Sequence, residues 1–267
     1  MPRVHVVIPA RFDSSRLPGK PLAVIAGKPM IQHVYERAKA SDLIDGVTVA
    51  TDDKRVVDAV KLFGGNVQLT SSSHSSGTAR VAEVARSLSA DIIVNLQGDE
   101  PLIRPEEIEK VVAPLINNKE VTVSSLMTPF QSMEEYLRPS SVKVLCNELG
   151  MAIYFSRWPL PFDSSFWKPN DGPIVEQWIS YFGRLQEKFD LKGLLAQRHI
   201  GIYSFQRDVL LDFVSREPAK LDQAEQLEQL KLLHYGTQIR MVSTSHQGRG
   251  VDTPADLEAV RKLMESL

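Results

Sequence analysis

The first hundred residues alternate short apolar runs with segments of helical spacing. Residues 4–8 form a continuous apolar run, as expected of a strand that is buried on both faces. Within residues 30–40, Ile31, Val34 and Tyr35 lie on one face of a predicted helix. Further strands are predicted at residues 46–50, 67–69 and 91–96, and helices at residues 53–63 and 78–87. This alternation predicts an α/β fold with a largely parallel, Rossmann-like sheet, whose ligand site lies at the carboxyl ends of the strands.

The middle of the chain has a different pattern. Apolar runs without a long helix between them predict an antiparallel extension, with strands at residues 122–127, 141–145 and 151–155. The remaining predicted elements are a helix at 176–189, a strand at 199–204, and helices at 222–234 and 254–267. No repeat or flexible linker divides the sequence. We therefore expect a single domain, residues 1–267, with an inserted dimer or sugar-side subregion at about residues 122–200.

Composition limits the classes of function. Of the 267 residues, 43% are hydrophobic and 24% are charged, which suits a folded globular protein. A formal net charge of -2 argues against nucleic acid as a partner, so any anionic ligand needs a local basic cluster. The single cysteine, Cys146, excludes an intrachain disulfide. The apolar start of the chain is too short for a signal peptide and no stretch could span a bilayer, so we expect a cytoplasmic protein.

Such a basic cluster follows the first predicted strand. The loop contains Arg11, Ser15, Arg16 and Lys20. Arginine binds pairs of phosphate oxygens and lysine acts as a point charge, so the loop suits a triphosphate. Its spacing is not that of a Walker loop. The alternative is a solvated, charged loop, although the prolines that end it favour a preformed site.

Residues 74–83 combine small hydroxyl side chains with a glycine at a predicted helix start. Ser76, Gly77 and Thr78 offer free amides and short hydrogen-bonding groups, which can read the edge of a small base such as cytosine. Ordinary capping of the helix by Ser76 or Thr78 explains the same residues.

Two carboxylates stand at positions that suit a metal. Asp99 follows Gly98 at the end of the fourth predicted strand, where it could hold Mg²⁺ against phosphates. Asp252 precedes a helix that opens with proline. The alternatives are an acidic turn at Asp99 and an N-cap region at Asp252, in which Thr253 caps at least as plausibly.

The segment Arg11-x-x-x-Ser15-Arg16-Leu17-Pro18-Gly19-Lys20-Pro21-Leu22 closely resembles the nucleotide loop of the 3-deoxy-manno-octulosonate (Kdo) cytidylyltransferases. The motifs at residues 74–83, 95–101 and 250–257 are also similar to that family, and the resemblance runs from about residue 4 to about residue 263. It implies a homodimeric, Mg²⁺-dependent enzyme that joins CTP to an acidic eight-carbon sugar, releases pyrophosphate and serves lipopolysaccharide synthesis.

The resemblance also implies roles for individual residues. Lys20, Asp99 and Asp252 would be catalytic, and the two aspartates would bind the metal. The nucleotide would be bound by Ala10, Arg11, Ser15, Arg16, Lys20, Ser76, Gly77, Thr78 and Arg80. The sugar would be bound by Gln97, Arg157, His199, Tyr203, Glu228 and Gln229. Without the resemblance, His199 and Tyr203 read as core groups, and Glu228 and Gln229 as an exposed helix face.

Three departures from the family pattern concern the sugar and the interface. Ala79 stands where the family usually has an acid, Lys231 replaces the usual arginine, and residues 164–197 form a longer stretch than is typical. The missing acid at position 79 motivates the hypothesis that the pocket accepts an 8-amino variant of Kdo.

Three other functions compete with this interpretation. A CMP-sialic acid synthetase has a looser version of the loop, and the segments around His199 and Glu228 favour Kdo over it. A nucleotide-sugar glycosyltransferase would usually show an Asp-x-Asp motif after a strand, which Asp52 and Asp53 lack because no residue separates them. A catalytically silent nucleotide-binding regulator would not need both Asp99 and Asp252.

Overall fold

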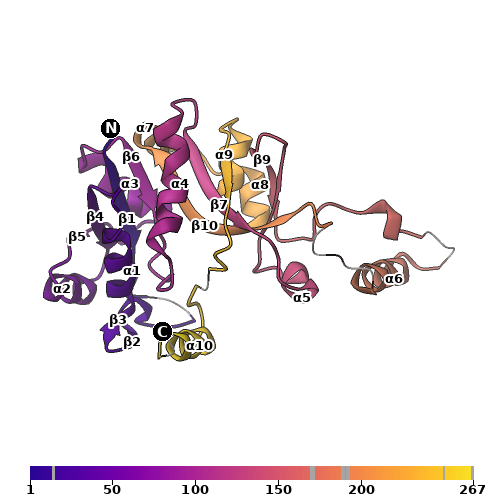
Figure 1. The fold of residues 1–267 in the computed structure, drawn as a ribbon, viewed down its shortest axis with the longest axis horizontal. Coiled ribbons are helices and arrows are strands. Elements are labelled where there is room, and N and C mark those ends of the chain that lie inside the picture. The colour runs from indigo at the N-terminus through magenta and orange to yellow at the C-terminus, as the bar shows by residue number, and fades with distance from the viewer. Residues whose placement is uncertain (14–15, 169–171, 188–189, 191–192, 249, 266–267) are drawn as a thin grey trace.

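The computed structural model describes residues 1–13, 16–168, 172–187, 190, 193–248 and 250–265 (Figure 1). Its centre is a mixed sheet with the strand order β11-β7-β10-β6-β1-β4-β5, to which β8 and β9 are added beside β10. The strands of this sheet are β1 (Val4–Pro9), β4 (Gly46–Thr51), β5 (Val67–Leu69), β6 (Ile92–Asn95), β7 (Val123–Thr128), β8 (Lys143–Cys146), β9 (Ala152–Ser156), β10 (Gln197–Gln206) and β11 (Arg240–Ser243). A short hairpin of β2 (Val24–Ile25) and β3 (Lys28–Pro29) stands apart from it.

Strand direction follows the expected pattern. β1 pairs in parallel with β4 and with β6, β4 pairs in parallel with β5, and β11 pairs in parallel with β7. β10 lies between β6 and β7 and is antiparallel to both. β8 is antiparallel to β10 and to β9. The predicted α/β fold, with a largely parallel sheet and an antiparallel extension, is confirmed.

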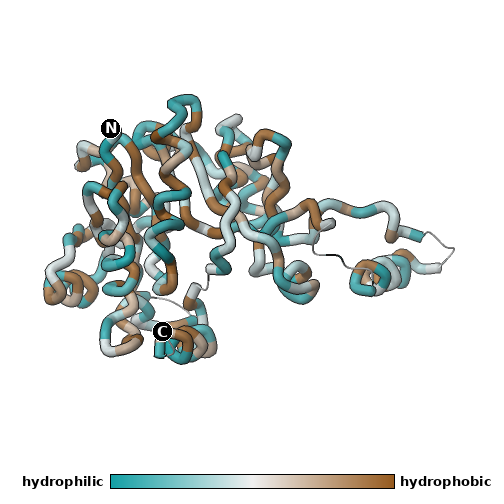
Figure 2. The backbone as a smooth tube through the Cα atoms, in the orientation of Figure 1, coloured by the Kyte–Doolittle hydropathy of each residue, from teal (hydrophilic) through white to brown (hydrophobic). Residues whose placement is uncertain are grey.

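Helices cover both faces of the sheet, and others lie beyond it. The helices of the described residues are α1 (Met30–Lys39), α2 (Lys54–Leu62), α3 (Gly77–Ser87), α4 (Pro105–Asn117), α5 (Met133–Leu137), α6 (Ile174–Glu187), α7 (Arg207–Ser215), α8 (Lys220–Glu225), α9 (Gln229–His234) and α10 (Pro254–Glu265), with short 3₁₀ turns η1 (Lys20–Leu22) and η2 (Ser164–Phe166). On β1, Val6 and Ile8 belong to one apolar core with α1, α2 and α4, and Val7 belongs to a second core with α3, α7 and α9. Figure 2 accordingly shows the inner strands as mainly hydrophobic. Burial on both faces explains why β1 is apolar at every position except His5, which is only partly buried.

The predicted single helix at residues 222–234 is wrong. The segment forms two helices, α8 and α9, because Gln226 takes a left-handed backbone conformation with φ of 52°. Such a conformation ends a helix, and it is uncommon for a residue other than glycine. The carbonyl oxygens of Glu225 and Gln226 accept hydrogen bonds from Arg157 instead of continuing the helix.

Other differences concern elements that the sequence analysis did not predict or placed differently. Helices α4, α5 and α7 were not predicted, and α6 begins two residues before the predicted start. The predicted helix ends at 188–189 and 266–267 lie outside the described residues. The division into one domain with an inserted subregion stays a prediction.

One part of the chain projects from the body of the molecule. In Figure 1, α6 lies on an extension to the right of the sheet, which we call the arm and define as the described residues of 158–196. Tyr181 and Leu185 of α6 pack with Phe130 and Tyr136 near α5 in a small separate core. Among the helices within the described ranges, none is both long and apolar enough to cross a membrane.

Candidate active site

The basic loop after β1 is held in one conformation by local contacts. Gly19 has φ of 71°, its amide donates to the Phe12 carbonyl oxygen at 3.0 Å, and a Cβ at this position would lie 3.3 Å from the Phe12 ring. The Arg55 guanidinium lies 3.4 Å from the centre of the same ring. Glycine is therefore required here both for the backbone conformation and for the close approach of the ring. The turn delivers Lys20 to the end of the sheet.

Lys20 lies between the two aspartates. Its Nζ is 2.6 Å from Asp99 Oδ2 and 3.1 Å from Asp252 Oδ1. Burial acts to lower the pKa of Lys20, but Asp99 and then Asp252 outweigh it, so the pKa is raised and the ammonium stays charged. Arg16 adds a second cation, 3.4 Å from Asp252. Three segments far apart in the sequence thus meet through one partly buried ammonium.

Gly98 allows Asp99 to reach this position. A Cβ at Gly98 would lie 2.9 Å from the backbone oxygen of Pro9, closer than side chains approach. A larger residue would push the end of β6 away from the end of β1. The glycine before Asp99 is thus explained by the close approach of two neighbouring strands.

Asp252 is left free to face Lys20. Thr253 Oγ1 accepts from the amide of Asp256 at 3.2 Å, and the Asp256 carboxylate accepts from the amide of Thr253 at 2.8 Å. This reciprocal pair caps the start of α10. The backbone amide of Val251 donates to the Asp99 carbonyl at 2.8 Å, which ties the segment before α10 to the end of β6.

A pocket of about 360 Å³ opens over these groups. Its lining contains most of the predicted nucleotide and metal residues, namely Ala10, Arg11, Arg16, Lys20, Ser76, Gly77, Arg80, Asp99 and Asp252, together with Gln97 of the predicted sugar set. Ser15 lies outside the described residues. Cations from the loop, carboxylates from two other segments and the start of α3 therefore face one space.

The start of α3 is capped by a side chain that also faces the pocket. Ser76 caps the helix by accepting from the amide of Ala79 at 3.2 Å, and it also lines the pocket. Two residues before Ser76, His74 accepts a hydrogen bond from Arg11 through its backbone oxygen, and its ring pairs with Glu83 of α3. These contacts join the basic loop to the helix terminus.

Arg80 is held more rigidly than the sequence indicated. Its side chain is fully buried, donates to Asp52 Oδ2 at 2.7 Å and donates to Thr70 Oγ1 at 2.5 Å. Asp52 follows β4 and Thr70 follows β5, so Arg80 ties the ends of two strands to α3. Sequence reasoning missed Asp52, because an acid after a strand carries no sign of its distant partner.

Thr78 faces the protein interior. Its hydroxyl donates to the carboxylate of Glu228 and accepts from Asn95 Nδ2 at 3.0 Å. Asn95 in turn accepts from Gln97 Nε2 at 3.1 Å. This chain of hydrogen bonds links the nucleotide pocket, through Gln97, to the residues predicted to bind the sugar.

The remaining predicted sugar residues come from three segments: β10, the start of α9 and, for Arg157, the position directly after β9. The rings of His199 and Tyr203 are 5.4 Å apart, and Glu228 is close enough to raise the pKa of Tyr203, after the larger effect of burial. Burial also raises the pKa of Glu228. Gln229 is only 5% exposed, so it lies in the interior and not on an exposed helix face. Arg157 donates its hydrogen bonds to backbone carbonyls.

His199 is neutral in this environment. Burial, followed by the positive charge of Arg198, lowers its pKa to about 3. Its Nε2 lies 3.0 Å from Ser125 Oγ and its ring packs edge-on against Phe155. A neutral imidazole can both donate and accept hydrogen bonds, as recognition of a hydroxyl requires.

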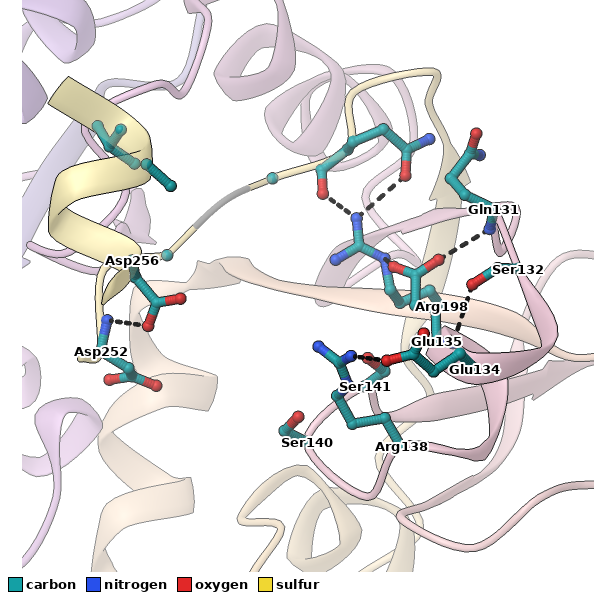
Figure 3. Close-up of a pocket in the computed structure, with 15 residues that line it drawn as sticks. Gln131, Ser132, Glu134, Glu135, Arg138, Ser140, Ser141, Arg198, Asp252 and Asp256 are labelled. Carbon is teal, nitrogen blue, oxygen red and sulfur yellow. Dashed lines mark hydrogen bonds and ion pairs between the residues drawn. The ribbon is translucent and has the colours of Figure 1, made fainter. Parts of the chain in front are cut away.

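A second pocket, of about 540 Å³, adjoins the first at Asp252 (Figure 3). Figure 3 shows Asp252 and Asp256 on one side of it and a network of charged side chains on the other. In that network Arg198 pairs with Glu135 at 3.0 Å and Arg138 pairs with Glu134 at 2.6 Å. Its charges are largely paired with one another.

Glu100 was not assigned a role from the sequence. Burial, followed by the nearby charge of Asp99, raises its pKa to about 8. A Cβ at Gly250 would lie 3.3 Å from its Oε1, so Glu100 packs against the segment that carries Asp252. The sequence offered one sign that Glu100 belongs to the site, namely its position directly after Asp99.

Comparisons with known proteins agree with this geometry. A cytidylyltransferase family model matches residues 5–239. The 3-deoxy-manno-octulosonate cytidylyltransferase of Geobacter sulfurreducens is 47% identical over 257 residues, which cover 96% of this chain and 97% of the relative. The enzyme of the same name from Pelobacter propionicus is 44% identical, with 99% of this chain and 98% of the relative covered.

Solved structures give the same result. A CMP:2-keto-3-deoxy-manno-octonic acid synthetase complexed with CTP superposes with a TM-score of 0.86 at 42% identity, covering 99% of both chains. A cytidylyltransferase from Leptospira borgpetersenii, with a TM-score of 0.61 at 17% identity, shares the fold and covers 100% of this chain and 88% of its own. The chain belongs to the cytidylyltransferase family and, within it, to the 3-deoxy-manno-octulosonate cytidylyltransferases.

The depressed pKa of His199 makes stability depend on pH. An unfolded histidine titrates near its ordinary pKa of 6.5, so between about pH 6.5 and 3 the unfolded state binds more protons and acidification destabilises the fold. When the pH falls from 7 to 5, the free energy of unfolding should decrease in the wild type. In His199→Gln this decrease should be smaller, by up to about 2 kcal/mol. Urea unfolding at each pH measures this.

The matched control is His234→Gln, because His234 is exposed. This variant should follow the wild-type pH dependence. Equal losses in all three proteins would show that His199 titrates normally.

Proposed function

We propose that the protein transfers CMP from CTP to the anomeric hydroxyl of an acidic 3-deoxy-octulosonate, Kdo or its 8-amino variant, with release of pyrophosphate. The observation that carries the proposal is the position of Lys20 between Asp99 and Asp252 in a pocket also lined by Arg11 and Arg16. The relatives and the CTP complex described above bear the same activity in their names.

The cations of the basic loop would bind the triphosphate. Arg11 and Arg16 can form paired hydrogen bonds to phosphate oxygens, and Lys20 offers a point charge. All three have protein oxygens as partners in this structure, so phosphate oxygens would take the places of those partners. Neutralising the phosphates stabilises the negative charge that builds up on the departing pyrophosphate.

The residues fit a magnesium ion. Asp99 and Asp252 present carboxylate oxygens to one cation, the Lys20 ammonium, and Mg²⁺ prefers carboxylate and phosphate oxygens. Asp99 and Asp252 would hold the ion, which would supply further charge neutralisation at the phosphates. Within the described residues, no group of three or more acids, histidines and cysteines could hold a metal by itself, so substrate oxygens would complete the set.

The sugar side would orient the nucleophile. Neutral His199, Tyr203 and Glu228 offer hydrogen bonds to hydroxyl groups, and the Thr78–Glu228 contact joins them to the nucleotide side. The anomeric oxygen forms a bond to the α-phosphorus, the bond to the pyrophosphate oxygen breaks, and the hydroxyl proton leaves to solvent or product. Holding the two substrates in line is the main contribution of such a site.

Removing either aspartate tests the reaction. Asp99→Asn and Asp252→Asn should each lower kcat/KM at least about a hundredfold in pyrophosphate release from CTP and Kdo. Chelation of divalent ions should abolish the wild-type activity, and added Mg²⁺ should restore it. Asp58→Asn, at an exposed acid of α2, is the matched control and should behave as the wild type.

The proposal fails if Asp99→Asn turns over normally with saturating Mg²⁺. Release of pyrophosphate with sialic acid but with neither octulosonate would instead favour a CMP-sialic acid synthetase. Silence with all three sugars would favour a nucleotide-binding protein.

Ala79 supports the 8-amino sugar as the preferred substrate. The residue lies in the first turn of α3, directly after Thr78, whose hydroxyl contacts Glu228. An acid at position 79 would add both bulk and charge to the first turn of α3, and alanine adds neither. We expect the ratio of kcat/KM for 8-amino-Kdo to that for Kdo to fall several-fold in Ala79→Glu.

Ala79→Gln separates the two causes, since it adds nearly the same bulk without charge. If the ratio falls equally in both variants, space decides the preference; if it falls only in Ala79→Glu, charge does. Equal efficiency on both sugars in all three proteins would contradict the hypothesis.

We also propose that the arm forms a homodimer. Apolar side chains are more than half exposed there, namely those of Trp158 (58%), Phe162 (51%), Ile174 (58%), Val175 (65%), Ile179 (67%) and Leu195 (72%). Ile174, Val175 and Ile179 lie on α6, and an apolar helix face of this kind is typical of an interface. A second copy of the chain would cover it.

Light scattering after gel filtration should give twice the chain mass of 29.8 kDa for the wild type. Ile179→Glu should shift the protein toward the monomer, because a buried charge opposes association. Leu62→Glu, at a 91% exposed leucine of α2, is the control and should stay dimeric. A monomeric wild type would refute the proposal.

We place the reaction in the cytoplasm and in lipopolysaccharide synthesis. The single, free cysteine Cys146 suits a reducing compartment. The family resemblance supports lipopolysaccharide synthesis, since the proposed reaction would make an activated octulosonate that a later transfer step could use.

A further inference from the structure

Glu225 joins the end of β9 to the end of α8. Its Oε1 accepts from Ser156 Oγ at 2.7 Å, and its Oε2 accepts from the amide of Arg157 at 2.9 Å. Both carboxylate oxygens are thus used to bind the segment that follows β9. This contact spans two regions that are distant in the sequence, and neither sugar recognition nor phosphate binding explains it.

Arg157 returns the contact in the opposite direction. Its Nε donates to the carbonyl oxygen of Glu225 at 2.7 Å, and its Nη2 donates to that of Gln226 at 3.1 Å. Its Nη1 donates to the carbonyl oxygen of Pro139 at 3.2 Å. The carbonyls of Glu225 and Gln226 are the ones that the break between α8 and α9 leaves without helical partners. The guanidinium therefore stabilises the left-handed conformation of Gln226.

Lys143 of β8 is the third charged residue of the cluster. Its side chain is fully buried, and its Nζ donates to the carbonyl oxygens of Arg157 and Arg138, each at 2.9 Å. Burial lowers the pKa of Lys143 to about 8, with Glu225 opposing and Arg157 adding to that effect. Burying an ammonium against carbonyls is costly, so its presence here indicates that holding these two carbonyls matters.

The contacts of this cluster affect the position of Glu228 and Gln229, which follow the break. Gln226 turns the chain and Leu227 is buried. Glu228, the N-cap of α9, then accepts a hydrogen bond from Thr78 of α3. A continuous helix through Gln226 would rotate Glu228 away from that position. The direction in which Glu228 points is thus fixed by contacts made two and three residues earlier.

We propose that Lys143, Arg157 and Glu225 form a positioning clamp for the sugar side of the site. The clamp holds the break between α8 and α9 so that Glu228 and Gln229 stand in place, and Arg157 contributes to it through its hydrogen bonds to the carbonyl oxygens of Glu225 and Gln226. The inference rests on the function proposed above. It makes Lys143 and Glu225 determinants of sugar binding, although neither touches the substrate.

The test compares Glu225→Gln, Arg157→Lys and the double variant in steady-state kinetics with Kdo and CTP. Each single change should raise the KM for Kdo about tenfold, since a misplaced site loses substrate contacts. The KM for CTP should change less than twofold, because the basic loop is separate. The double variant should be no worse than the worse single variant, since both changes disable one unit.

Lys143→Met extends the test to the buried lysine and should give the same pattern. If this variant does not fold, the Glu225 and Arg157 pair carries the test by itself. Glu217→Gln and Lys220→Met, at exposed positions near α8, are the matched controls and should leave both KM values unchanged.

Four outcomes would overturn the clamp. A KM for Kdo that rises with Arg157→Lys but not with Glu225→Gln would show that Arg157 binds the sugar directly. Fold-changes that multiply in the double variant would show two independent contacts. Variants that lose only thermal stability would show a purely structural role. A wild type that releases no pyrophosphate with either octulosonate would refute the proposed function itself, and the clamp with it.

Discussion

The ammonium of Lys20 holds together the parts of the chain that make this site. Asp99 and Asp252 come from the end of β6 and from the segment before α10, and without a cation between them their carboxylates would repel each other. The sheet makes the encounter possible, because β1 and β6 are parallel neighbours whose carboxyl ends lie side by side. Gly98 removes the last steric obstacle. When substrate and metal bind, Lys20 could turn from the two aspartates to phosphate oxygens, and the aspartates could turn from Lys20 to the metal.

The two sides of the site differ in their electrostatics. Charged groups gather around Lys20 on the nucleotide side, whereas the sugar side is built from buried groups that burial pushes toward their neutral forms, as with His199 and Glu228. A triphosphate needs cations, and a polyhydroxylated sugar needs donors and acceptors in fixed directions. The link from Gln97 to Glu228 keeps these two environments in register.

The parts that local chemistry specifies could be predicted from the sequence. The apolar run of β1 and the loop after it located Lys20, and the rule on strand ends located Asp99. Helix α4 also has clear apolar spacing after Pro105 and was nevertheless overlooked. The break at Gln226 could not be predicted, because residues 222–234 have helical character and the contacts that interrupt it come from Arg157, a distant position. Hydrogen bonds to backbone carbonyls leave no periodic trace in a sequence, so Lys143 was equally invisible.

The reversed strand β10 has a consequence for synthesis of the protein. It occupies the place between β6 and β7 but is made long after both of them. While the chain leaves the ribosome, one edge of β6 can pair with β1, but the other edge has no correct partner until about a hundred further residues have emerged. An open strand edge invites wrong pairing, and β7, which arrives first and runs parallel to β6, is the nearest wrong partner. The rate of translation between β6 and β10 therefore affects how long β6 is exposed to wrong pairing, although the folded structure shows no trace of this.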